Sequence, residues 1–345
     1  MCYNINMKKI LSNKIYEKPL KFIKNNYKFL LVYLFLFLLI TVRLDYEIYM
    51  PGGLTNLDKR ITVEGGNSTE GSFNLTYVKA KPGTIPIILL SYAIPSWDLI
   101  SIDDERIDEE SKEDILKRGK IDLESSENKA VKVAFDNAGV PYEIINRKVI
   151  VYHTLEGSIT DLLVGDTIKS INGKKINSFD DLKSVINENK VNSTLSINVI
   201  RDNKEKKVEA TIIENDGEKV LGLYLVESFD IKSDVNVKFN YKGSESGSSG
   251  GLMSTLEIYN RLIKEDITKG LKIAGTGTIN EDGTVGEIAG VKYKLKGAVK
   301  NKADIFIVPE ENYKEAKELK EKNNYKIKLI EAKTFEGVLE ELNKL

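Results

Sequence analysis

The residues that could do chemistry gather in one short stretch, 243–259, which reads GSESGSSGGLMSTLEIY. Gly and Ser residues lead directly into Leu252, Leu256 and Tyr259, an apolar set at helical spacing. A glycine-rich loop lets the backbone approach a ligand closely, and the start of a helix supplies unpaired N–H groups. A serine held there has donors nearby for a developing oxyanion. The alternative is that the segment is a flexible surface loop.

The cysteine and histidine content excludes most other catalytic centres. Cys2 is the only cysteine and His153 the only histidine. These counts rule out an intramolecular disulfide, a cysteine-based metal cage and a zinc site held by several histidines. A Ser-His-Asp or Cys-His enzyme would have to use His153, which lies in the strand-like run VIVYHTLEG and is assigned to structure. We therefore expect no metal and no cofactor.

Length and charge indicate a multidomain protein that does not bind nucleic acid. The 345 residues, 41% of them hydrophobic, can bury a sizeable core and suggest two or three units. A net charge of -1 offers no electrostatic attraction to a polyanion.

A charge-free apolar run, FLLVYLFLFLLITV at 29–42, predicts a transmembrane anchor over 29–44, since Arg43 can extend its side chain to the lipid interface. A signal peptide is the competing interpretation, but the following RLDYEIYMPGG has no small-residue cleavage pattern. Residues 1–28 hold seven lysines and one acid, Glu17. The positive-inside rule therefore predicts a single-pass protein of the cell membrane with a cytoplasmic N-terminus and extracellular C-terminal domains. A translocated chain without disulfides is typical of bacteria.

Residues 45–141 are expected to form a β-rich lead-in and a helical connector. The runs TYVKA and IPIILLSYAI, separated by turn residues, predict short strands. Helical spacing of Ala130, Val133, Ala134 and Ala138 predicts a helix over 111–138 that ends at Gly139. We expect no catalytic residue in this part.

Residues 142–213 have a different pattern, in which strand-like runs flank VGDTIKSINGKKINSFDDLKSVI. Ser178 is placed to cap a helix with Leu182, Val185 and Ile186 on one face. The Gly-Asp-x-Ile turn, the Ile-Asn-Gly hairpin and the helix resemble a PDZ domain. The resemblance implies that an extended peptide binds by strand addition beside that helix, with the carboxylate-binding loop near 156–159. A small β-domain that acts only as a spacer is the alternative.

The C-terminal part, 214–345, reads as an α/β domain. After the helix that begins in the stretch 243–259, we expect a strand, a hairpin at Asp282-Gly283, a turn at Gly290 and a helix. A buried strand to Pro309 and helices over about 311–322 and 334–344 should follow. The linked blocks GSSGGLM, DITKG, IAGTGTI, GTVGEIAGVKYK and ADIFIVPEEN resemble the Lon proteolytic domain. With the anchor and the inserted PDZ-like domain, the whole chain resembles the membrane-anchored PDZ-Lon proteases of Gram-positive bacteria.

The resemblance implies a catalytic serine at Ser249, a lysine at Lys294 and a threonine at Thr276. Ser248 and Lys292 are the neighbouring alternatives. Backbone N–H groups around Gly247, Ser248 and Gly250 would bind the oxyanion. Where the family usually has Pro-Ser-Ala-Gly, this chain has Ser248, Ser249, Gly250 and Gly251, which should hold the loop less rigidly.

A Ser-Lys dyad agrees with the single histidine, because a neutral lysine can serve as the base for a serine hydroxyl. The chain has no Gly-x-x-x-x-Gly-Lys-Ser/Thr phosphate loop, so no ATP-driven unfolding is expected. We therefore predict an α+β multidomain protein: an ATP-independent, membrane-anchored serine endopeptidase that acts on extended peptides or proteins. The alternative is a surface-anchored peptide-binding scaffold with a degenerate Lon-like domain. The sequence leaves the substrate open, and also whether the chain forms a homo-oligomer.

Overall fold

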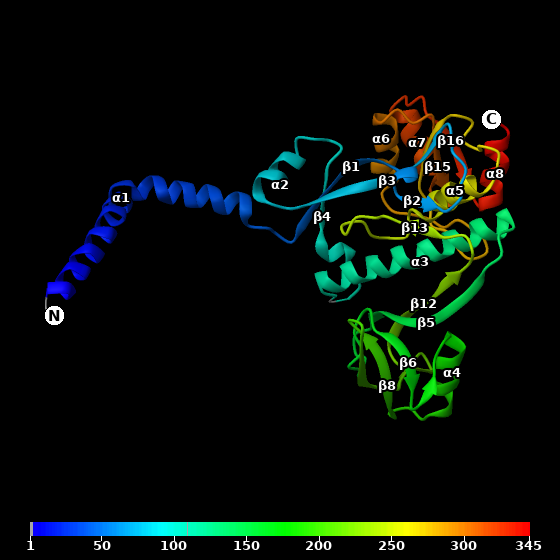
Figure 1. Cartoon of the computed structure of the whole chain (residues 1–345), viewed down its shortest axis with the longest axis horizontal. Helices are drawn as coiled ribbons and strands as arrows, with labels where there is room; N and C mark the ends of the chain where they lie inside the picture. The colour runs from blue at the N-terminus through cyan, green and yellow to red at the C-terminus, as the bar shows by residue number, and fades with distance from the viewer. Residues whose placement is uncertain (1–2, 109) are drawn as a thin grey trace. The chain divides into compact units, whose positions relative to one another are not determined.

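The computed structural model describes residues 3–108 and 110–345 (Figure 1), so that Cys2 lies outside the described residues. The chain divides into two compact units. One comprises Met1–Met50 and Ala80–Asp104, and the other comprises Pro51–Lys79 and Glu105–Leu345.

The first unit contains helix α1 (Tyr3–Thr41), helix α2 (Ile85–Ser91) and strand β4 (Asp98–Ser101), which pairs antiparallel with the start of β1 (Tyr46–Asn56). Within the described residues, one helical segment is long and apolar enough to cross a membrane, Pro19–Thr41 of α1, and none of it is buried. Residues 29–41 of the predicted anchor therefore belong to a helix that begins much earlier, and residues 42–44 follow its end.

The prediction of a strand in IPIILLSYAI is wrong, because these residues begin with helix α2. Pro86 has no N–H to donate to a neighbouring strand, whereas the first turn of a helix needs no such donor. Thr84 is extended and precedes the helix as its N-cap. The proline therefore favours a helix start where the apolar pattern alone allows either structure.

The sheet that positions the candidate site has the strand order β16-β15-β14-β3-β1-β4, and its strands β14, β15 and β16 lie wholly in the second unit. Strand β14 (Lys272–Gly275) is parallel to both β3 (Ser72–Pro82) and β15 (Ile305–Pro309), and β16 (Lys328–Ala332) is parallel to β15. Helices α5, α6, α7 and α8 complete this α/β domain, at Gly251–Leu262, Val291–Lys300, Glu310–Lys322 and Phe335–Asn343. The α/β prediction is confirmed, although β16 was not foreseen.

The predicted hairpin at Asp282-Gly283 is a turn without flanking strands. Asn280 N donates to Thr284 O at 2.9 Å, and a single bridge joins Thr284 to Thr334. The two residues therefore change the chain direction as expected, but the loop that they belong to extends from β14 to α6.

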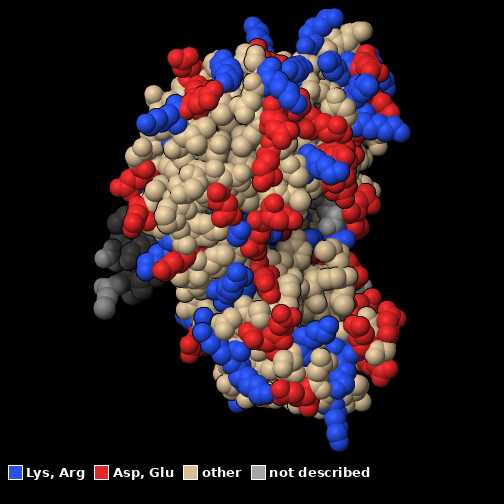
Figure 2. All heavy atoms as spheres, turned by 90° about the vertical axis from the view of Figure 1, so that its right-hand side faces the viewer, with Lys and Arg blue, Asp and Glu red and all other residues tan. Residues whose placement is uncertain are grey.

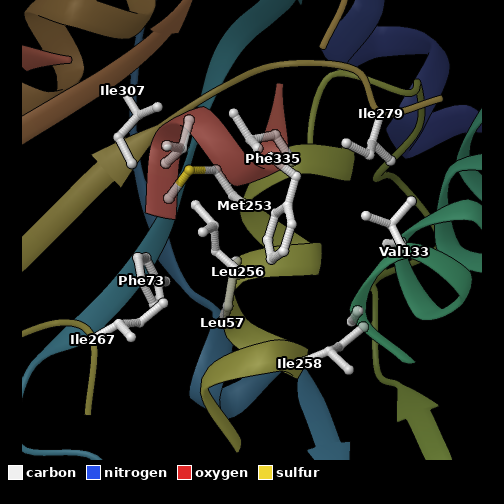
Figure 3. Close-up of a cluster of buried hydrophobic side chains, with 14 of the residues drawn as sticks. Leu57, Phe73, Val133, Met253, Leu256, Ile258, Ile267, Ile279, Ile307 and Phe335 are labelled. Carbon is white, nitrogen blue, oxygen red and sulfur yellow. The ribbon is translucent and has the colours of Figure 1, made fainter. Parts of the chain in front are cut away.

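The main hydrophobic core surrounds α5 (Figure 3). Leu252, Met253 and Leu256 of this helix are fully buried and contact side chains from the sheet, such as Phe73 and Ile307. Because burial of each large apolar side chain contributes roughly 1.5–3 kcal/mol, this core fixes the start of α5 firmly.

The long helix α3 (Lys112–Ala138) packs both against the core around α5 and against strand β5 of the second sheet. Ser111 caps its start, and Gly139, in the left-handed conformation, ends it where the sequence predicts the end. Its C-terminal half packs Ala130, Val133 and Ala134 into the same core as α5. Nearer its start, Ile121 packs against Ile150 in a separate cluster.

Residues 143–232 form a second sheet with the strand order β12-β5-β6-β8-β9. Ser178 and Asp181 form a capping box at the start of α4 (Phe179–Glu188), whose Leu182, Val185 and Ile186 are buried as predicted. The strands of this region, with the short pairs β10-β11 and β13-β2, have the following bounds: β5 Glu143–Thr154, β6 Thr167–Ile171, β7 Lys174–Lys175, β8 Thr194–Arg201, β9 Lys204–Thr211, β10 Ile213–Asn215, β11 Glu218–Val220, β12 Leu223–Lys232, β13 Val237–Phe239 and β2 Ile61–Val63. The 3-10 turns η1 and η2 lie at Leu57–Lys59 and Ile102–Glu105.

The edge strand beside α4 is β12, so the expectation that 156–159 precede the groove strand is wrong. Gly222 immediately precedes β12 and has a φ of +68°. Its carbonyl accepts from Leu155 N at 2.9 Å, and an added Cβ would lie 2.7 Å from that of Ser158. Residues 155–158 therefore pack against the loop that leads into β12, which the local sequence pattern could not show.

Candidate active site

Ser249 lies directly before helix α5, with Gly250 as the N-cap. Ser249 is partly exposed, so that a substrate can approach it. A helix of this length carries partial positive charge at its N-terminus, which favours negative charge on a nearby oxygen. The glycine-rich sequence thus places a serine at a helix start, where an alkoxide or oxyanion is stabilised.

The backbone of Ser249 is held by the segment that follows β14. Its carbonyl accepts two hydrogen bonds, from Gly277 N at 2.9 Å and from Thr276 Oγ1 at 3.0 Å. Leu252 N donates to Gly277 O at 3.1 Å. Gly275 allows this close approach, since an added Cβ would lie 2.5 Å from Met253 Sδ. The conformation of the loop that contains Ser249 is therefore fixed by the carboxyl end of a buried parallel strand.

Lys294 lies in the first turns of α6 and only 4% of it is exposed. Burial lowers its pKa from the usual 10.5 to about 8. The helix begins at Gly290, whose left-handed backbone and close contact with Val78 exclude other residues. A buried lysine with such a pKa is neutral in a substantial fraction of molecules near pH 8 and can accept a proton.

The Thr276 hydroxyl joins the two candidate catalytic residues. Lys294 Nζ donates to Thr276 Oγ1 at 3.1 Å, and Thr276 Oγ1 donates to the Ser249 carbonyl at 3.0 Å. Thr276 is fully buried, so water does not compete for these bonds. Among the described residues, no hydrogen bond joins Lys294 Nζ to Ser249 Oγ. The structure therefore brings Ser249, Thr276 and Lys294 together through one hydroxyl group.

The neighbouring alternatives have other surroundings. Lys292 is exposed, and its Nζ lies 4.9 Å from the ring centroid of Tyr293. The carbonyl of Ser248 accepts from Ser126 Oγ at 3.2 Å and from Gly251 N at 3.1 Å. His153 is buried beside Asp108, with 3.2 Å between Nε2 and the carboxylate. Of the two lysines, Lys294 alone is buried and bonded to Thr276.

Of the backbone N–H groups predicted to bind the oxyanion, one is already used in a hydrogen bond. Gly247 N donates to Gly119 O at 2.8 Å, so this N–H is occupied. Within the part of the chain that the structure describes, the N–H groups of Ser248, Ser249 and Gly250 donate to no protein acceptor. A pair of such groups at a helix start is the usual form of an oxyanion hole.

Helix α3 supports the loop that contains Ser249, a role that the sequence interpretation missed when it expected no functional residue before the PDZ-like region. Gly119 O and Ser126 Oγ contact the loop at Gly247 and Ser248, as described above. Lys120 Nζ donates to Gly243 O at 2.7 Å. The only available signal was a set of small residues, Gly119 with Ser125 and Ser126, inside an otherwise amphipathic helix.

A cavity of about 380 Å³ lies between α3 and the segment that joins β12 to the loop that contains Ser249. Its lining combines apolar side chains with Glu127, whose pKa burial raises to about 7. Tyr241 lies close to Glu127 and shares a hydrogen bond of 3.0 Å with Ser254 of α5. The apolar residues that line the cavity include Val131, Phe135, Ile231, Val235 and Phe239.

Two family models match the chain: the PDZ domain at residues 139–212 and the Lon protease (S16) C-terminal proteolytic domain at residues 230–344. No curated protein matches it. Among solved structures, the PDZ domain of an SdrC-like protein from Listeria monocytogenes is 24% identical, with 23% of this chain and 86% of that chain covered and a TM-score of 0.21. The second domain of a Listeria protein is 26% identical, covering 23% and 83%, with a TM-score of 0.21. A protein from Geobacillus thermodenitrificans is 25% identical, covering 20% and 82%, with a TM-score of 0.19.

Proposed function

Because the chain combines a PDZ domain with a Lon-type proteolytic domain and is therefore a PDZ-Lon protease, we propose that it cleaves extended peptide segments with a Ser249-Lys294 dyad, without ATP. The burial of Lys294 against the Thr276 hydroxyl carries this proposal. A lysine with a lowered pKa, next to a residue that holds the serine backbone, has no evident structural purpose.

In the proposed reaction, the Ser249 hydroxyl attacks the carbonyl carbon of a peptide bond while the neutral amine of Lys294 takes the hydroxyl proton. The N–H groups of Ser249 and Gly250 stabilise the negative oxygen of the tetrahedral intermediate. When the C–N bond breaks, Lys294 returns the proton to the leaving amine and Ser249 holds the acyl group as an ester. Lys294 then takes a proton from water as the water oxygen attacks the ester carbon, and it gives this proton to the Ser249 oxygen when the ester C–O bond breaks and the acid product leaves.

Thr276 is proposed as a positioning residue. Its hydroxyl accepts from the amine of Lys294 and donates to the carbonyl of Ser249, so it fixes both partners without touching the reacting carbon. In the proposal, Lys294 Nζ reaches the Ser249 hydroxyl once a substrate is bound, because catalytic hydrogen bonds often tighten only in the substrate complex.

The PDZ domain is proposed to bind the substrate along β12. This strand is at the edge of its sheet, and the carboxylate of Glu227 on it accepts from Phe179 N at the start of α4, at 2.5 Å. Phe179 and Tyr224 are 42% and 53% exposed beside this edge. An open strand edge next to exposed aromatic rings favours binding of an extended peptide by strand addition.

We also propose that α1 anchors the protein in the cell membrane, with residues 1–28 in the cytoplasm and the two domains outside. Nucleic acid is not a proposed partner. On the face that Figure 2 shows, basic and acidic side chains are interspersed, without a large field of one sign.

The direct test measures cleavage of a fluorescently labelled, unstructured protein by the full chain, with and without ATP. Ser249→Ala and Lys294→Met should each lower the rate by roughly a thousandfold or more, as losses of catalytic groups do. The rate of the wild type should not depend on ATP.

Ser248→Ala and Lys292→Met serve as matched controls, because they change the neighbouring residues of the same types. Both should retain cleavage. If Ser248→Ala abolishes it while Ser249→Ala does not, the nucleophile is misassigned. A wild type that binds peptide through the PDZ domain without cleaving any test protein would favour the scaffold alternative.

A further inference from the structure

The segment 83–97, GTIPIILLSYAIPSW, contains no charged residue, although it lies outside the proposed transmembrane helix. It includes helix α2 and the turns that follow it. Three of its large side chains are strongly exposed, namely Leu89 at 66%, Leu90 at 46% and Tyr92 at 77%. Such a cluster of exposed apolar residues on a water-soluble surface marks an interaction site.

The burial pattern of α2 is the reverse of that in a soluble helix. Its only buried residue is Ser91, whose hydroxyl donates to Ile88 O at 2.7 Å. The isoleucines of the helix are half-buried, and its two leucines are exposed. A helix whose most exposed side chains are apolar is expected where the surroundings are hydrocarbon rather than water.

The position of α2 identifies which hydrocarbon surrounds it. Leu44, three residues after α1, donates through its N–H to Gly83 O at 2.8 Å, and Gly83 N donates to Tyr46 O at 2.7 Å. These bonds place the start of α2 next to the C-terminal end of α1, and the two helices are in contact (Figure 1). If α1 spans a membrane, α2 therefore lies where the chain leaves the bilayer.

We propose that α2, with Tyr92 and Trp97, is a second membrane contact that inserts into the outer leaflet beside α1. A helix of seven residues is about 10 Å long and cannot cross a hydrocarbon core of roughly 30 Å, so it must lie at the interface. Tyr and Trp are the residues that favour this depth. Arg43 and Lys81, which flank the segment in the fold, are suited to lipid phosphates.

This inference rests on the proposed anchoring by α1 but not on the proposed catalysis. Besides lipid, a second copy of the chain or another membrane protein could cover the same apolar face. Lipid is favoured because the exposed segment is continuous with the end of a helix whose apolar surface is itself unburied.

Trp97 is the only tryptophan and lies inside the segment, so its fluorescence reports directly on the proposal. The full chain is reconstituted in vesicles of phosphatidylcholine and phosphatidylglycerol, with and without brominated acyl chains. Flotation of the vesicles first shows whether α1 anchors the chain. In floated samples, brominated lipid should reduce Trp97 emission by at least about half, as expected for an interfacial aromatic side chain.

The variant Leu89→Asp/Leu90→Asp should float as the wild type does but lose most of the quenching. Leu163→Asp is the matched control, since Leu163 is 49% exposed on the PDZ domain and should leave quenching unchanged. Anchored chains whose Trp97 is not quenched would overturn the α2 proposal alone. Chains that do not float would overturn the anchor and this inference together. Crosslinking of two copies through position 92, with no effect of brominated lipid, would show that a second copy covers the face.

Discussion

The buried position of Lys294 lowers the stability of the fold but suits the amine to accept a proton. Burial alone lowers its pKa to about 8, so the protein holds an amine in a place where its charged form is unfavourable. Thr276 supplies one hydrogen bond to it. The same property that makes the lysine a usable base makes it costly to the fold.

The first prediction concerns the pH dependence of cleavage. The base must be neutral, so kcat/KM should rise with pH and level off above a pKa of about 8, the value for Lys294. An initial-rate profile between pH 6 and 10 would check this. A rate that is level or falls across pH 7 to 8 would contradict a lysine base.

The second prediction concerns the stability of Lys294→Met. A pKa lowered from 10.5 to about 8 corresponds to roughly 3 kcal/mol against the charged form, so the variant should gain up to that amount in free energy of unfolding at pH 7. Between pH 8 and 10.5 the unfolded wild type binds more protons than the folded protein, and its stability therefore rises with pH. The advantage of the variant should shrink over this range in urea titrations.

At the scale of the elements, two helical glycines have opposite surroundings. Gly251 begins α5, and an added Cβ there would lie 2.7 Å from both Ile279 Cγ2 and Ser126 Oγ. Gly297 lies in α6, where an added Cβ would have 3.5 Å to its nearest neighbour, Gly52 O. Helix α5 thus needs its first glycine for packing, whereas helix α6 does not need Gly297.

The third prediction follows from this pair. Gly251→Ala should lower the free energy of unfolding by about 1–3 kcal/mol through overpacking and should slow cleavage, because it displaces the loop beside Ser249. Gly297→Ala should instead raise stability by about 0.5–1 kcal/mol, since alanine favours a helix. Chemical denaturation of both variants would check the signs, and equal effects would contradict the packing argument.

Much of the element pattern follows from local sequence. The capped start of α4 at Ser178 and the glycine end of α3 at Gly139 are local signals, and the structure has them where they are predicted. Helix α2 was mistaken for a strand because a short apolar run fits both structures, and its exposure depends on surroundings that a periodicity argument does not contain.

The residues of the candidate site were predicted from linked motifs, but the contacts of helix α3 that hold the loop around Ser249 were not predicted. Ser249, Thr276 and Lys294 came from the resemblance, and their catalytic roles stay predictions. That Gly119 and Ser126 hold the loop depends on contacts between residues more than 120 positions apart, which no local pattern encodes. For the same reason the sequence could not show that Gly247 N–H is occupied.

At the scale of the whole molecule, the fourth prediction concerns sidedness. In intact bacterial cells, protease added from outside should degrade the chain after residue 44 and leave the lysine-rich N-terminal segment protected. Epitope tags at the two ends, followed by immunoblotting, would distinguish them, with a cytoplasmic protein as the control for lysis. Protection of the C-terminal tag would reverse the proposed orientation.

Strands β5 and β12 are the two routes by which the chain enters and leaves the PDZ domain, and they pair where Glu143 lies opposite Lys232. Both ends of the domain therefore lie side by side on one ribbon. A module with adjacent ends can be exchanged for another without stretching its host. If the PDZ domain selects substrates as proposed, a foreign peptide-binding domain grafted at this ribbon should redirect cleavage to new substrates without any change in the Lon-type domain.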